Sequence, residues 1–109
     1  MLHIDNNTRE NMTICRFEGR LDTIACLKYS EEISVLTSNL KTGADTGEIT
    51  DHPIVFDLRD VNYISSSFIR ICVNTAKQIS KGQFSIIHCD PFIKKTFKIA
   101  GLDDLLNIS

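Results

Sequence analysis

The segment IVFDLRDVNYISSSFIRICV, residues 54–73, passes from the pattern of a strand to the pattern of a helix. Its first five residues, 54–58, are apolar apart from one acid, which is typical of a strand buried on both faces of a sheet. From Phe68 onward, apolar side chains recur every three or four residues, which predicts a helix that ends at Gly82. Three serines, residues 65–67, occupy the junction between the two elements.

The chain before this segment predicts a hairpin and a long helix. Residues 2–6 and 12–19 alternate partly between apolar and polar side chains, and the polar residues between them favour a turn. Asp22 or Thr23 is expected to cap the next helix, because a short polar side chain there accepts a hydrogen bond from an unpaired backbone N–H group. Apolar residues at spacings of three and four continue this helix to Leu40.

A loop, another strand and a last helix complete the predicted elements. Residues 41–53 hold two glycines and a proline and almost no apolar side chain, so they predict a loop. Residues 84–89 predict a second buried strand. Asp90 and Pro91 predict the start of the last helix, because the acid can cap it and proline is tolerated in the first turn. Gly101 is expected to end it.

The resulting order is β-β-α-β-α-β-α, and residues 105–108 could add a short edge strand. Strands that alternate with amphipathic helices predict an α/β protein with right-handed crossovers. All 109 residues are expected to form one domain around one core, because no repeat or low-complexity linker divides them.

The composition is that of a globular protein. Hydrophobic residues make up 42% and charged residues 24%, and the formal net charge of -2 gives no broad attraction to nucleic acid or anionic lipid. No apolar run reaches the roughly 18 residues that would span a bilayer, and the polar N-terminus lacks the pattern of a secretory signal. We therefore expect a cytoplasmic protein without membrane insertion or direct contact with nucleic acid.

The cysteines and histidines do not predict a metal site, and no cofactor is expected. Their spacings match neither paired zinc knuckles nor a redox CxxC motif. We expect the cysteines to be small buried residues that stay reduced; they are Cys15, Cys26, Cys72 and Cys89. The glycines form no phosphate-binding cluster, so the chain is not expected to bind nucleotide by itself.

The serine cluster raises the question of a hydrolase, which the neighbouring residues disfavour. A nucleophilic serine on a strained turn needs flanking glycines, and Ile64 and Phe68 stand in their neighbourhood instead. A catalytic triad would also need a base, and only His52 or His88 could serve. We therefore do not expect an enzyme.

Three carboxylates, Asp22, Asp57 and Asp60, are each expected near the carboxyl end of a strand. This rim is where ligands and partners dock in open α/β sheets, so converging acids would mark a docking site. The alternative, which the sequence leaves open, is that Asp22 caps the first helix and Asp60 caps a turn.

Three segments, in this order and spacing, resemble the STAS domain, and within it the small stand-alone anti-sigma factor antagonists of bacteria. They are FEGRLDTIACLKYSEEI (17–33), IVFDLRDVNYISSSFIRICV (54–73) and DPFIKKTFKIAGLDDLL (90–106). The family pattern combines a G-x-L-D turn, a D-L-x-x-V-x-x-[DI]-[ST]-S-x-G-[LI] signature and a P-x-[VI]-x-x-x-[FL]-x-x-x-G-L helix. The matching residues are Gly19, Leu21, Asp22, Ile64, Ser65, Ser66, Ile93, Phe97, Gly101 and Leu102. The resemblance implies a mixed β-sheet of four to five strands with helices packed mainly on one face.

The resemblance also implies a regulator that changes partners. Ser66 stands at the phosphoacceptor position, and Phe68 stands where the family usually has glycine, which would put a large side chain in the path of a partner. The implied partners are an anti-sigma factor that is also a serine kinase of the histidine-kinase-type (GHKL) group, and a serine phosphatase. A weak homodimer is compatible with this resemblance. The residues expected to contact the partner are Asp22, Thr23, Asp57, Ser65, Ser67 and Phe68.

Two functions are compatible with this fold. In the first, the unphosphorylated protein binds the anti-sigma factor and so frees a sigma factor, and phosphate on Ser66 releases it again. In the second, the domain is a scaffold subunit of a lipid-transport or sensory complex, and the serines only cap a helix. The fold does not separate them, because function resides in the site.

Overall fold

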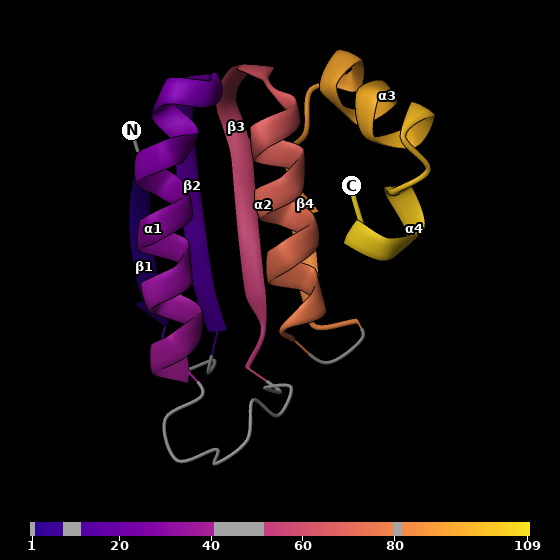
Figure 1. The fold of residues 1–109 in the computed structure, drawn as a ribbon. Helices are drawn as coiled ribbons and strands as arrows, with labels where there is room; N and C mark the ends of the chain where they lie inside the picture. Colours follow the sequence, from indigo (N-terminus) through magenta and orange to yellow (C-terminus); the bar gives the residue numbers. More distant parts are fainter. Residues whose placement is uncertain (1, 8–11, 41–51, 80–81) are drawn as a thin grey trace.

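A computed structural model describes residues 2–7, 12–40, 52–79 and 82–109 (Figure 1). The predicted loop at residues 41–53 therefore lies mostly outside the described residues. The strands are β1 (Leu2–Asn7), β2 (Met12–Leu21), β3 (Ile54–Ile64) and β4 (Phe84–Ile87). The helices are α1 (Thr23–Leu40), α2 (Ser66–Lys77), α3 (Pro91–Ile99) and α4 (Asp103–Leu106).

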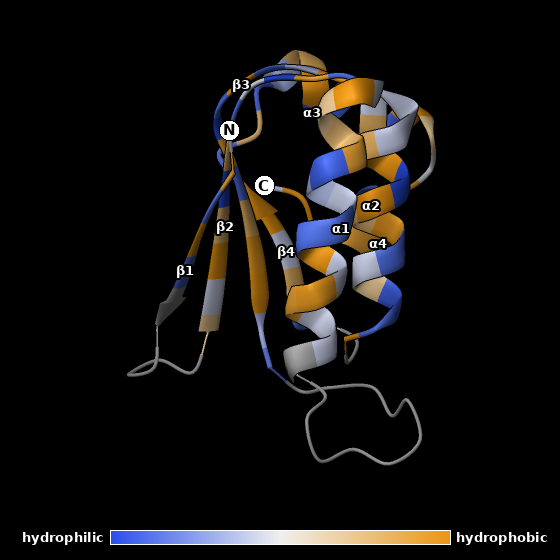
Figure 2. Cartoon of the chain, turned by 60° about the vertical axis from the view of Figure 1, so that its left-hand side comes forward, coloured by the Kyte–Doolittle hydropathy of each residue, from blue (hydrophilic) through white to orange (hydrophobic). Residues whose placement is uncertain are grey.

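The four strands form one mixed sheet in the order β1-β2-β3-β4. The strands β1 and β2 are antiparallel, as the predicted hairpin requires, and the pairs β2-β3 and β3-β4 are parallel. Figure 2 shows α1, α2 and α4 on one face of this sheet. The predicted α/β class is confirmed, and so is the mixed sheet of four to five strands that the resemblance implies. No helix of the described part is long and apolar enough to cross a membrane.

The strand β3 is longer than the sequence predicted. Residues 54–58 were expected, and the strand extends to Ile64. Its first part lies between β2 and β4 and is buried, whereas beyond Asp57 it pairs with β2 alone. A strand with only one neighbour tolerates polar side chains, so the polar residues after Leu58 did not end it as the sequence pattern suggested.

Phenylalanine rings join the helix layer to the sheet. Phe17 on β2 lies between Phe56 and Phe68, with ring centroids 5.0 Å and 5.1 Å away in edge-to-face contacts. The ring of Phe68 is fully buried, so it fastens the first turn of α2 onto the two central strands. The expectation that Phe68 stands in the path of a partner is therefore wrong, because its side chain points into the core.

The C-terminal part confirms one prediction and corrects another. Asp90 caps α3, and its Oδ1 accepts a hydrogen bond from the Phe92 backbone N–H at 2.8 Å. The last residues do not form the extra strand that was considered for residues 105–108. They form the short helix α4, and only Ile108 pairs with β4, through an isolated bridge to Ile86.

We expect Phe68→Ala to lower the free energy of unfolding by about 3–5 kcal/mol, because it leaves a cavity between the sheet and α2. Urea denaturation measures this loss. Phe92→Ala removes the same ring from a position that is 79% exposed, and it should change stability by less than about 0.5 kcal/mol. Equal losses in the two variants would contradict the role given to Phe68.

Candidate functional site

The N-termini of α1 and α2 lie side by side at the carboxyl ends of β2 and β3 (Figure 1). The parallel pairing of these strands continues to their last residues, Leu21 and Ile64. The backbone N–H of Ser65 then donates to the carbonyl of Leu21 at 3.0 Å, which ties the two strand-to-helix turns together. Carboxyl ends of parallel strands are the usual docking rim of open α/β sheets.

The three serines at the start of α2 have three different environments. Ser65 is the N-cap, and its Oγ accepts from the Phe68 backbone N–H at 3.4 Å. Ser66 is the first residue of the helix, is exposed, and makes no side-chain hydrogen bond within the described residues. Ser67 is half-buried and faces α1. The hydroxyl of Ser65 therefore caps the helix, and the hydroxyl of Ser66 is available to an approaching protein.

Asp22 and Thr23 begin α1 at the same rim. Asp22 Oδ1 accepts from the Ala25 backbone N–H at 2.9 Å, which confirms the predicted cap. Its second oxygen, Oδ2, lies 3.9 Å from Arg20 Nε. Thr23 is exposed and is the first residue of the helix. Asp22 is thus both a structural cap and a negative charge at the rim.

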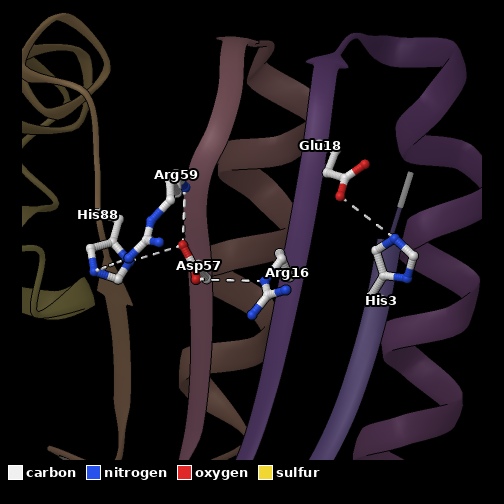
Figure 3. Close-up of polar contacts among 6 residues, drawn as sticks. All are labelled: His3, Arg16, Glu18, Asp57, Arg59 and His88. Atoms are coloured by element: carbon white, nitrogen blue, oxygen red, sulfur yellow. Dashed lines mark hydrogen bonds and ion pairs between the residues drawn. The ribbon is translucent and has the colours of Figure 1, made fainter.

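Asp57 lies far from this rim, contrary to the expected convergence of three acids. It occupies the middle of β3 on the sheet face away from the helices (Figure 3), with seven further residues before the strand ends. Those seven residues extend about 20 Å. Its side chain is only 8% exposed and forms an ion pair with Arg16 at 3.8 Å, while His88 Nδ1 donates to it at 3.1 Å. The Arg59 backbone N–H also donates to Asp57 Oδ1, at 3.0 Å.

This polar cluster explains Asp57 as a structural residue. A buried carboxylate is stabilised when its oxygens accept several hydrogen bonds and a cation lies nearby, and both conditions hold here. Asp60 is exposed and is paired in register with Glu18, four residues before the end of β3. Of the three acids that were expected to converge, only Asp22 lies at the rim.

A shallow groove of about 200 Å³ separates α1 from α2 next to the serines. Leu27 and Arg70 line it from the two helices, and Ile24 precedes it on α1. Ile24 is 79% exposed and Leu27 is 72% exposed, so two large apolar side chains face solvent in the first two turns of α1. The sequence analysis missed these two residues. Both are out of phase with the buried stripe of α1, and apolar residues out of phase with such a stripe indicate exposed apolar side chains.

The site does not resemble a hydrolase centre within the described residues. His88 contacts Asp57 on the open sheet face, and His52 Nε2 lies 2.8 Å from Thr13 Oγ1, so neither reaches the serines. Cys26 Sγ lies 3.9 Å from Ser65 Oγ, but burial raises the pKa of this thiol, so it stays protonated at neutral pH. Among the described residues, no cluster of His, Cys, Asp and Glu could hold a metal ion.

Burial also raises the pKa of the other three thiols. It raises the pKa of Cys15 to about 12 and that of the half-buried Cys89 to about 11, and Cys72 is shifted in the same direction. All four cysteines are free, as the sequence predicted, and Cys89 is less buried than expected.

Comparison with known proteins gives one family. The family model "STAS domain" matches residues 3–109. By sequence, the chain is 32% identical over 95 residues to a putative anti-sigma factor antagonist, BtrV, of Bordetella bronchiseptica, covering 83% of this chain and 78% of that protein.

Solved structures agree on the fold. An anti-sigma factor antagonist from Mycobacterium paratuberculosis superposes with a TM-score of 0.79 at 15% identity, covering 99% of this chain and 83% of that one. The antagonist SpoIIAA in its unphosphorylated form superposes with a TM-score of 0.65 at 17% identity, covering 91% and 83% of the two chains. With the family match over nearly all of its length and a relative named as an anti-sigma factor antagonist, this chain belongs to the STAS domain family.

Proposed function

We propose that this protein is an anti-sigma factor antagonist that changes partners when Ser66 is phosphorylated. The unphosphorylated protein binds an anti-sigma factor through the rim where α1 and α2 begin, and the phosphorylated protein dissociates from it. One observation carries the proposal: Ser66 is exposed at the start of α2, next in the chain to Ser67, which lines the groove, while Ser65 caps the helix. The relative BtrV is named as a putative anti-sigma factor antagonist, which supports an anti-sigma factor as the partner. The structural neighbour SpoIIAA is described in its unphosphorylated form, which supports phosphorylation as the switch.

In this proposal the chain is a ligand and a substrate, and the partner is the enzyme. The anti-sigma factor, a serine kinase of the histidine-kinase type, holds ATP in the cytoplasm. The Oγ of Ser66 attacks the γ-phosphorus, the bond to the bridging oxygen breaks, ADP leaves, and the hydroxyl proton passes to a base of the kinase. A serine phosphatase reverses the change by hydrolysing the phosphoester with water.

Apolar contacts would supply most of the docking energy. Ile24 and Leu27 are large exposed apolar side chains in the first two turns of α1, and Leu27 lines the groove. A partner that covered them would gain the free energy of burying apolar surface. Thr23, Ser67 and Arg70 line the groove between the helices and add polar contacts. Phe68 is buried, so it does not obstruct the approach of a kinase.

Electrostatic repulsion explains why phosphate would release the partner. A phosphate adds a charge of about -1.5 to -2 at the rim, which already carries Asp22. Two negative charges against one carboxylate of a partner, about 8 Å away in an effective dielectric of 20–40, give a repulsion of about 2–4 kcal/mol. This corresponds to a loss of affinity of roughly 30- to 700-fold. The helix itself tolerates the phosphate, because helix N-termini favour anions.

Incubation with the cognate anti-sigma factor and ATP should add one phosphate to the protein, and Ser66→Ala should abolish this. Intact-mass spectrometry counts the phosphates, and peptide mapping locates them. Ser65→Ala and Ser67→Ala are the matched controls, and both should still accept one phosphate. Phosphate found on residue 65 or 67 of the unaltered protein would contradict the assignment.

We expect Ile24→Ser to weaken binding of the unphosphorylated protein to the anti-sigma factor by about 10- to 30-fold, as the loss of an apolar anchor does. Isothermal titration calorimetry measures the affinity. Ile99→Ser is the matched control, since Ile99 is 77% exposed on α3 against 79% for Ile24, and its loss should leave the affinity unchanged. A weaker affinity in both variants would show that the effect is not local to the rim.

Asp57→Asn should lower the free energy of unfolding by about 1–3 kcal/mol, because it weakens the hydrogen bonds and the ion pair of a buried carboxylate. The rate of phosphorylation at Ser66 should not change, since Asp57 lies on the other face of the sheet. Urea denaturation and a kinase assay on the same sample separate the two effects. If the variant folds but the kinase no longer phosphorylates it, Asp57 would belong to the docking site after all.

A further inference from the structure

Arg70 is a cation next to the proposed phosphorylation site, and it has no partner in the part of the chain that the structure describes. It is exposed on α2, four residues after Ser66. The other arginines of the described residues all have contacts: Arg16 with Asp57, Arg20 with Asp22 and the ring of Tyr63, and Arg59 with His88. Arg70 alone among them makes no hydrogen bond or ion pair within the described residues.

Helix geometry brings Arg70 and Ser66 together. Side chains four residues apart lie on the same side of a helix, with Cβ atoms about 5–6 Å apart. Helical side chains tilt toward the N-terminus, so the guanidinium of Arg70 leans toward the turn that contains Ser66. An anion that precedes a cation by four residues is also the favourable order on a helix. A phosphate on Ser66 would therefore lie within reach of Arg70.

Arg70 also belongs to the groove between the helices. It lines this groove together with Ser67 and Asn74 of the same helix, opposite Leu27 of α1. In the unphosphorylated protein its guanidinium is thus available to a carboxylate of any protein that covers the groove. Arginine suits this task, because its planar group binds carboxylate and phosphate alike through two parallel hydrogen bonds.

We propose that Arg70 responds to the phosphorylation of Ser66. In the unphosphorylated protein its guanidinium pairs with a carboxylate of the docked anti-sigma factor, and after phosphorylation it pairs with the phosphate on Ser66 instead. This inference rests on the proposed function and adds a second effect to it. Phosphorylation then repels the partner and also removes the cation that the partner used.

Among the described residues, the charged groups around the site do not compete for a pair between Arg70 and a phosphate on Ser66. Asp22, the acid at the rim, is engaged by the Ala25 backbone N–H and by Arg20. The first turn of α2 contains no acidic residue, and the other basic residue of the helix, Lys77, lies in its last turn. Arg70 is therefore the cation of α2 that an intrahelical phosphate on Ser66 can reach.

The test uses the full chain with phosphoserine installed at position 66 during translation, so no kinase is needed. Titration by ³¹P NMR follows the second ionisation of the phosphate. A nearby cation favours the dianion, so the midpoint should lie about 0.15–0.4 pH unit lower in the unaltered background than in Arg70→Gln. Lys77→Gln is the matched control, since it removes one positive charge from the last turn of the same helix and should leave the midpoint unchanged. Equal midpoints with and without Arg70 would overturn the proposal.

Binding of the unphosphorylated protein to the anti-sigma factor tests the second part. Arg70→Gln should weaken it by about tenfold, Arg70→Lys by less, and Lys77→Gln not at all, as expected for one charge-assisted contact. An unchanged affinity in Arg70→Gln would overturn the role of Arg70 in the groove.

The two proposals fail in different ways. A kinase that leaves Ser66 unmodified, together with a lower midpoint in the installed phosphoserine, would refute the proposed function and support the Arg70 pair. Phosphorylation of Ser66 with equal midpoints would refute the Arg70 pair and support the proposed function.

Discussion

The parallel pairing of β2 and β3 through to Leu21 and Ile64 is the constraint on which the site depends. Each strand turns directly into a helix, and the hydrogen bond from Ser65 N–H to the Leu21 carbonyl fixes one turn against the other. Because the two strands end together, the two helix N-termini are brought together as well. The capped acid of α1 and the serines of α2 thus share one rim, although more than forty residues separate them in the chain.

Packing beneath this rim leaves the hydroxyl of Ser66 without a structural role among the described residues, as the proposed phosphorylation requires. Phe68 packs against the rings of Phe17 and Phe56 on the two central strands, which fixes the first turn of α2, and Ser65 accepts a hydrogen bond from a backbone N–H group of that turn. Neither contact involves the hydroxyl of Ser66. A phosphate can therefore be added at this position without removing a cap or a core contact, and the effect of the modification falls on the surface. This separation of stability from regulation is what a reversible switch requires.

The open face of the sheet has a different character. Asp57, Arg16 and His88 satisfy one another there, and the long side chains shield a carboxylate that would otherwise be costly to bury. The rim instead combines exposed apolar side chains with an arginine that lacks a partner among the described residues. The contrast between this satisfied polar face and the exposed groups of the rim is the main physical reason for proposing a docking surface at the helix N-termini.

Local patterns in the sequence determined the order of the elements and the caps at Asp22 and Asp90, because periodicity and capping depend on residues only a few positions apart. The choice of Ser66 came from the resemblance to the STAS family and stays a prediction. Tertiary structure decided the rest. The length of β3 depends on which strands lie beside it, and this length moved Asp57 away from the rim. Burial of Phe68 depends on rings contributed by β2 and β3, and the groove exists only because α1 and α2 lie side by side. A sequence pattern reports which faces of an element are apolar, whereas the neighbours that cover those faces come from distant parts of the chain.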